Sequence, residues 1–119
     1  MGDTQYPPGP QSDDLADYGK LAVQETLRCD GVTGMHKGVA DRLGMRKISG
    51  VAIRRDKEDR LHLDISIIVK YGTDLRKLGS DIQNAVVRAI AQESAEPVAQ
   101  INVVVADIEF AGQGPTNEG

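Results

Sequence analysis

The residues of this chain that could do acid–base chemistry are few. His62 and Asp64 stand two positions apart in a stretch with strand-like alternation, so their side chains share one face and could form an oriented acid–base pair. No Ser, Cys or Lys is tied to this pair by a motif, and the sequence holds no P-loop, dinucleotide fingerprint or nucleophile elbow. The pattern favours a surface ion pair over a catalytic dyad, and we expect neither enzymatic activity nor a cofactor.

A metal site would have to be built from a small set of ligands. Cys29 is the only cysteine, which excludes an intrachain disulfide, and the only histidines are His36 and His62. Cys29 and His36 could approach each other in space. Without a second cysteine or a paired histidine, however, they indicate a small buried thiol and a loop histidine. We therefore expect no metal site and a reducing compartment.

Two features could bind nucleic acid. The stretch Gly31-Val32-Thr33-Gly34 has the bare spacing of the loop with which KH domains clamp a nucleic-acid backbone. Between Arg42 and Arg60, seven basic and three acidic residues give a local charge of +4, whereas the whole chain carries −4 and the remainder therefore −8. The aromatic content of 3% and the overall acidity count against nucleic acid, although a KH-like module that uses the basic 42–60 segment stays as the alternative. This polarity suits head-to-tail contacts or docking on an acidic partner better.

Length and composition predict one small domain. The chain has 119 residues, of which 39% are hydrophobic, and no apolar run approaches the roughly 20 residues that cross a bilayer. Residues 1–11 lack the basic and apolar segments of a secretory signal, so we expect a cytoplasmic protein. Glycine and proline predict disordered tails at 1–11 and 111–119, which leaves a folded domain at 12–110.

Helical periodicity appears twice. A first helix is expected from the N-cap Ser12 to the stop signal Asp30-Gly31, and a second from the cap Thr73 to a residue before Pro97. Each helix has one apolar stripe. The stripes are Leu15, Tyr18, Ala22, Val23 and Thr26 in the first helix, and Leu75, Leu78, Ile82, Val86, Ala89 and Ile90 in the second.

Strand patterns lie between and after these helices. Residues 51–55 and 60–70 predict an antiparallel hairpin with a charged turn at 56–59, and the alternation in 60–70 is the clearest in the chain. The glycine-rich stretch before it gives weaker signals, for a short strand at 32–35 and one or two helical turns at 39–43. In the final strand, residues 98–110, the apolar phase switches near Val105, which suggests a bulge or a passage from one-sided to two-sided burial.

These elements predict an α+β fold of order α-β-β-β-α-β, with two helices packed on one face of a mainly antiparallel three- to four-stranded sheet. The other face would be polar and exposed to solvent, and Ile68 marks where a partner would contact it. The polar residues expected there are Arg54, His62, Asp64, Ser66, Lys70, Gln100 and Asn102. Together with the basic turn between Arg54 and Arg60, the expected interaction surface consists of Arg54, Arg55, Arg60, His62, Asp64, Ile68 and Lys70.

Several core motifs are similar to those of a known family. They are Ser49-Gly50-Val51, the run from Leu63 to Gly72, Ile82-Gln83 with Val86, and Ile101-Asn102-Val103-Val104-Val105, and the Tyr71-Gly72 step before an Ile-Gln helix is the most telling. Over residues 14–110 the chain resembles the alkaline-shock, or envelope-stress-response, family of mainly Gram-positive bacteria. The resemblance implies a cytoplasmic, non-enzymatic stress-response protein that self-associates. It also implies attachment to the inner face of the cell membrane through a small membrane-anchored partner, and it supplies no catalytic residues.

Overall fold

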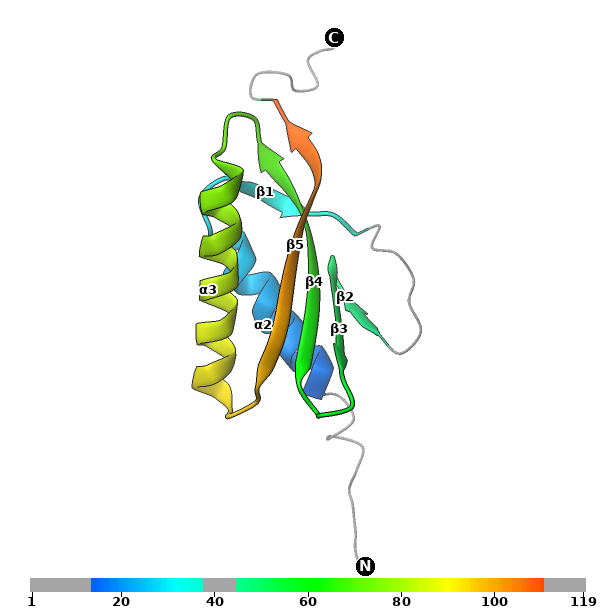
Figure 1. The fold of residues 1–119 in the computed structure, drawn as a ribbon. Coiled ribbons are helices and arrows are strands. Elements are labelled where there is room, and N and C mark those ends of the chain that lie inside the picture. Colours follow the sequence, from blue (N-terminus) through cyan, green and yellow to red (C-terminus); the bar gives the residue numbers. More distant parts are fainter. Residues whose placement is uncertain (1–13, 38–44, 111–119) are drawn as a thin grey trace, which may run out of the picture.

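The computed structural model describes residues 14–37 and 45–110 (Figure 1). The expected cap Ser12, the helical turn at 39–43 and the two tails lie outside these ranges. The elements, in chain order, are α2 (Asp14–Leu27), β1 (Val32–Met35), β2 (Arg46–Ile48), β3 (Val51–Arg55), β4 (Leu61–Lys70), α3 (Leu75–Glu93) and β5 (Val98–Glu109).

Strand β4 is the centre of the sheet. It pairs antiparallel with β3 along its first half, with β1 along its second half, and parallel with β5 along its whole length. Strand β2 continues the sheet beyond β3. The predicted α+β class with a mainly antiparallel sheet is confirmed, as is the short strand at 32–35. The sheet has five strands rather than three or four. The additional strand, β2, could not be recognised in the sequence because it is only three residues long and two of them are charged.

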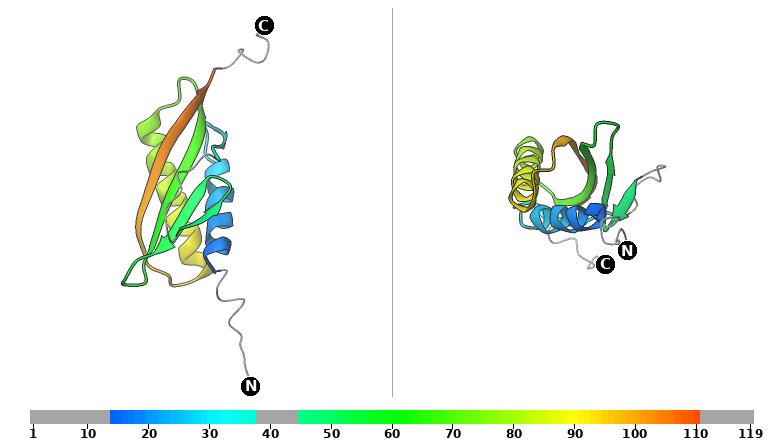
Figure 2. Two further views of the ribbon diagram at one scale, coloured as in Figure 1. Left: turned by 90° about the vertical axis from the view of Figure 1, so that its right-hand side faces the viewer. Right: turned by 90° about the horizontal axis from the view of Figure 1, so that it is seen from below.

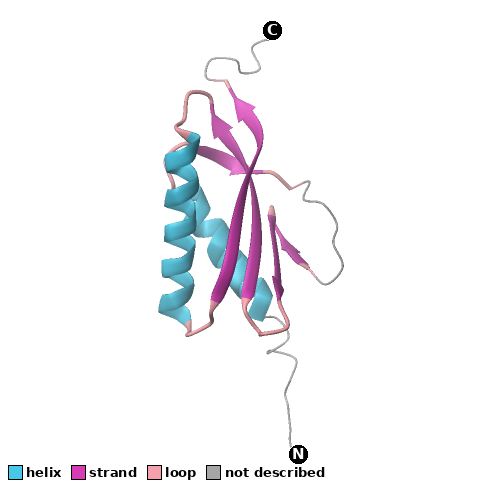
Figure 3. Cartoon of the chain, in the orientation of Figure 1, coloured by secondary structure: helices cyan, strands magenta, loops and turns pink. Residues whose placement is uncertain are grey.

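Both described helices lie on one side of this sheet (Figures 2 and 3). The alternation expected in β4 is real, since its core-facing residues from Leu61 to Val69 are at most 1% exposed. They meet the apolar stripe of α3, whose buried members are Leu78, Ile82, Val86, Ala89 and Ile90. Helix α2 adds small residues, and a Cβ built on Gly19 would lie 2.8 Å from Cγ1 of Ile48. That close approach of helix and strand explains why so short a segment as β2 is held in the sheet.

The start of α3 differs from the prediction in one residue. Asp74, not Thr73, is the N-cap, because its carboxylate accepts a hydrogen bond from the Lys77 amide at 3.1 Å. The Thr73 hydroxyl instead donates to the Lys70 carbonyl at 2.7 Å and closes the turn between β4 and α3. A carboxylate stabilises this helix end more than a threonine hydroxyl does, because its negative charge is also attracted to the positive end of the helix dipole.

The bulge expected in the last strand is present. Val105 pairs with Ile67 and Asp107 with Ile68, so Ala106 is an extra residue without a partner in β4. Its insertion returns Ile108 to the face that Val105 occupies, opposite Val69. The alternation of polar and apolar residues in β5 is therefore re-phased, which is the change of pattern visible in the sequence.

Candidate interaction surface

The sheet face opposite the described helices carries ordered polar side chains. Two rows cross it, one formed by Arg54, His62 and Gln100 and the next by Asp64 and Asn102. We call these five residues the polar face. Gln100 donates to the Asn102 carbonyl oxygen at 3.1 Å, and Asn102 donates to Asp64 at 2.9 Å. This chain of hydrogen bonds holds the side chains of neighbouring strands in fixed orientations.

His62 and Asp64 share this face but have different partners. His62 Nε2 lies 2.8 Å from Oδ2 of Asp56 in the β3–β4 turn, whereas Asp64 accepts from Asn102. The expected ion pair between His62 and Asp64 is therefore wrong. The imidazole is instead tied to the turn, and its side chain is only 19% exposed.

Asp56 organises the β3–β4 turn. One carboxylate oxygen accepts from the backbone amides of Glu58 and Arg60 at 2.8 and 3.0 Å, and the other accepts from Arg60 Nε at 3.0 Å and meets His62. The amide of Arg60 and the His62 ring together hold the pKa of the Asp56 carboxyl far below its ordinary value. The sequence offered a signal for this role, since an aspartate at the first position of a tight turn commonly binds the amide two residues on.

The lowered pKa of Asp56 makes the stability of this turn depend on pH. A carboxyl whose pKa is depressed in the folded state stabilises it above the unfolded pKa, near 3.8, and loses this effect as the pH falls through the folded value. We therefore expect Asp56→Asn to lower the urea unfolding midpoint by a constant amount above about pH 5. The difference from the unmodified chain should shrink below pH 4.

Urea titrations of both chains between pH 2 and pH 8 measure this effect. Asp81→Asn is the control, because Asp81 belongs to an exposed pair with Lys77 on the surface of α3. A difference between Asp56→Asn and the unmodified chain that stays constant down to pH 2 would contradict the role of the carboxylate charge.

Of the three arginines of the expected surface, Arg55 and Arg60 already have ion-pair partners. Arg55 lies in the row of Leu61, off the polar face, and makes two hydrogen bonds to Glu96 at 2.6 and 3.2 Å. The carboxylate of Glu96 raises the pKa of the Arg55 guanidinium. Arg60 lies within 2.8 Å of Glu58 and 3.0 Å of Asp56. Among the described residues, Arg54 has no ion pair, so the basic turn offers one free guanidinium rather than three.

The second half of β4 separates the remaining expected residues. The expectation that Ser66 is exposed to solvent is wrong, since Ser66 is only 7% exposed. Its carbonyl accepts a hydrogen bond from the His36 amide at 2.9 Å. Ile68 is half-buried, and its Cδ1 lies 3.9 Å from where a Cβ on Gly34 would stand. Lys70 is exposed and lines a pocket at the end of the sheet. The structure therefore brings together Arg54, His62 and Asp64, with Lys70 and Ile68 further along the strand.

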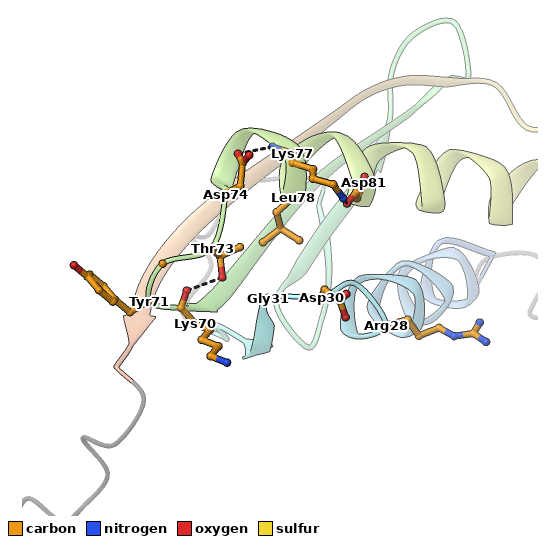
Figure 4. Close-up of a pocket in the computed structure, with 11 residues that line it drawn as sticks. Arg28, Asp30, Gly31, Lys70, Tyr71, Thr73, Asp74, Lys77, Leu78 and Asp81 are labelled. Carbon is orange, nitrogen blue, oxygen red and sulfur yellow. Dashed lines mark hydrogen bonds and ion pairs between the residues drawn. The ribbon is translucent and has the colours of Figure 1, made fainter.

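The pocket near Lys70 was not anticipated from the sequence. It has a volume of about 530 Å³ and lies between the end of α2 and the start of α3 (Figure 4). Its charged lining residues are Arg28, Lys70, Lys77, Asp30, Asp74 and Asp81. Because acids and bases are present in equal number and Lys77 binds Asp81 at 2.8 Å, the pocket has no strong preference for ligand charge.

The other candidate sites raised by the sequence are not assembled. Cys29 donates to the carbonyl of Glu25 at 3.5 Å, and burial raises the pKa of its thiol. Within residues 14–37 and 45–110 no three His, Cys, Asp or Glu side chains form a group that could hold a metal. Gly31 ends a turn with φ +105° and Gly34 lies inside β1, so this stretch is not the loop between two helices that a KH clamp requires.

Comparison with known proteins agrees with the motifs found in the core. A model of the alkaline shock protein 23 family, described by a cell envelope-related function, matches residues 19–110. A search of curated proteins gave no match. Neither α2 nor α3 combines the length and the apolar character needed to cross a bilayer. Since the family model covers most of the 119 residues, this chain belongs to the alkaline shock protein 23 family and shares its cell envelope-related function.

Proposed function

We propose that this chain is a non-enzymatic, self-associating protein of cell-envelope homeostasis that docks on a small membrane-anchored partner. Membership of an envelope-related family gives the general function. The proposal adds the means: the protein stays on the cytoplasmic side and reaches the inner face of the membrane through its partner.

The polar face is the observation that carries the docking part of the proposal. Both described helices lie on the opposite side of the sheet, so no described helix covers this face. Its amides and carboxylate are held by hydrogen bonds before any partner arrives, which reduces the entropy lost on binding. Arg54 lies in the same row as His62 and Gln100 and has no ion pair to any described residue.

A guanidinium without an ion pair, on a face that also carries two ordered amides, favours a particular partner chemistry. Arginine binds a carboxylate through two parallel hydrogen bonds, and Gln100, on the far side of His62 in the same row, supplies further polar groups for a peptide backbone. The partner segment that fits best is therefore an extended acidic one. The His62 ring is held by Asp56 at 2.8 Å, so this side chain too is fixed in orientation before a partner arrives.

Crosslinking in native cells tests the docking part. Tagged full-length chain would be crosslinked gently and purified separately from membrane and soluble fractions, and the captured proteins identified by mass spectrometry. We expect a small membrane-anchored protein in the membrane fraction, and a several-fold lower yield of it with Arg54→Glu because the charge of the contact is reversed. Arg88→Glu, on the exposed surface of α3, is the matched control and should leave the yield unchanged.

Two results would count against this proposal. Equal recovery of the membrane protein with Arg54→Glu and the unmodified chain would remove the polar face as the docking surface. Recovery from the soluble fraction alone, together with RNA or ribosomal proteins, would favour the nucleic-acid-binding alternative.

A further inference from the structure

Strand β5 forms an edge of the sheet. Of the described strands only β4 pairs with it, although β5 runs for twelve residues from Val98 to Glu109 (Figure 1). Edge strands present unpaired amides and carbonyls, which makes a long one a template for another strand. From Val98 to Ala106 this edge carries no charged residue and no proline.

The register shows which backbone groups point away from the sheet. In a parallel ladder, alternate residues direct both backbone groups toward the neighbouring strand and the residues between them direct theirs outward. Gln83 on α3 donates to the carbonyl of Ile101 at 2.9 Å, so Ile101 is one of the outward residues. Val103 and Val105 follow at the same alternation, and no described side chain is bound to their outward groups.

The two ends of this outward segment are closed in different ways. At one end the carbonyl of Ile101 is already occupied by Gln83. At the other end the extra residue Ala106 reverses the alternation, so that the Glu109 carbonyl points toward β4 and accepts from the Tyr71 amide at 2.8 Å. The open template is therefore limited to Val103, Val104 and Val105.

We propose that two copies of this chain pair antiparallel through β5, with Val103 of each opposite Val105 of the other and the two Val104 side chains facing each other across a twofold axis. This inference rests on the self-association in the proposed function and names its interface. The register follows from the closed ends, because a shift toward Ile101 competes with Gln83 and a shift the other way meets the bulge at Ala106. Val103 and Val105 then exchange their outward amide and carbonyl groups in both halves of the dimer.

The charge distribution favours a second copy as the occupant. Across a twofold axis each patch meets its own copy, so in a chain with a net charge of −4 a symmetric contact is favoured where the patch is neutral. The segment from Val98 to Ala106 is neutral, and in this register Asp107 lies opposite Ile101 rather than another acid. Val104 is 48% exposed in one copy and would be covered by its counterpart.

Helix α3 offers a second contact in the same arrangement. Gln83 and Val87, together with Val98 and Ile101 of β5, line a shallow groove of about 210 Å³ beside the edge. A twofold axis perpendicular to the sheet places both copies of α3 on the same side and next to each other. Val87 is 44% exposed and Gly79 has no atom within 4 Å of an added Cβ, so this side of the helix has room for its counterpart.

A charge-swap experiment tests the interface. Sedimentation velocity over a range of concentrations would give the dimer dissociation constant of the unmodified chain and of Val104→Lys and Val104→Glu. Each variant alone should dimerise about tenfold more weakly, because like charges face each other and apolar contact is lost. An equimolar mixture of the two should recover the affinity as a heterodimer. Leu27→Lys, at a residue 47% exposed on α2, is the matched control and should not change the constant.

A cysteine at the same position provides a second readout. In the proposed register the two Val104 residues form a non-hydrogen-bonded pair, whose Cα atoms lie about 4.5 Å apart and within the reach of a disulfide. Val104→Cys in a Cys29→Ser background should oxidise to a covalent dimer, whereas Leu27→Cys in the same background should not.

The outcomes separate this inference from the proposed function. If the unmodified chain dimerises but Val104→Lys and Val104→Glu dimerise equally well, the β5 interface is wrong and self-association stands. If the unmodified chain stays monomeric at every concentration, both the interface and the self-association are wrong. The crosslinking experiment still tests the docking part, since it does not depend on β5.

Discussion

Ile65→Ala should lower the free energy of unfolding by about 3 kcal/mol and the melting temperature by more than about 10 °C. Ile65 is fully buried in the middle of β4, between Val51 of β3 and Val103 of β5. Removing its outer carbons leaves a cavity that the strands on both sides cannot close, because their own partners fix them. Urea and thermal unfolding monitored by far-ultraviolet circular dichroism would measure the loss.

The control for this prediction is Leu27→Ala. Leu27 is 47% exposed at the end of α2, so its truncation should change the free energy of unfolding by less than about 0.5 kcal/mol. Equal losses for Ile65→Ala and Leu27→Ala would mean that β4 is not the centre of the core.

The elements with strong periodicity could be predicted because their signal is local. The alternation from Leu61 to Val69 and the stripe of α3 each reflect one buried face, and both are visible without knowledge of the neighbours. The change of phase near Val105 allows two explanations, a bulge or a change of burial, and the structure shows the bulge, with Ala106 as the inserted residue.

Strand β2 could not be predicted in this way. Its three residues have no alternation to detect, and it is held by the close contact between Ile48 and Gly19 of α2. That contact joins residues 29 positions apart in the sequence. The parallel pairing of β4 with β5 is likewise a property of the α3 crossover rather than of either strand.

In the candidate surface, too, the sequence predicts which residues share a face but not which groups they bind. The sequence placed Arg54, His62 and Asp64 on one face, which required only the period of a strand. It could not show that His62 binds Asp56 or that Asp64 accepts from Asn102, because hydrogen-bond partners depend on the folded chain. The pairing of Arg55 with Glu96 could not be seen for the same reason, since Glu96 lies 41 positions further along the chain.

Gly31→Ala should lower the free energy of unfolding by about 3 kcal/mol through two separate effects. Gly31 has φ +105°, a backbone conformation that residues with a side chain rarely adopt. An added Cβ would also lie 2.6 Å from Cγ2 of Thr73. The turn cannot shift freely, because the Gly31 carbonyl accepts from the Lys70 amide at 2.8 Å while the Thr73 hydroxyl donates to the Lys70 carbonyl at 2.7 Å. Pushing Thr73 away therefore disturbs the end of β4 and the pocket beside Lys70 together.

Gly72→Ala separates the strain at Gly31 from the collision. Gly72 has φ +91° but no atom within 4 Å of an added Cβ, so it reports backbone strain alone, and we expect a loss of about 1–2 kcal/mol. Thr73→Ser removes the methyl group that meets the new Cβ while keeping the hydroxyl. Introduced with Gly31→Ala, it should recover part of the lost stability, measured by urea unfolding as a double-mutant cycle. If the two substitutions are additive, the collision with Thr73 contributes nothing and strain alone accounts for the loss.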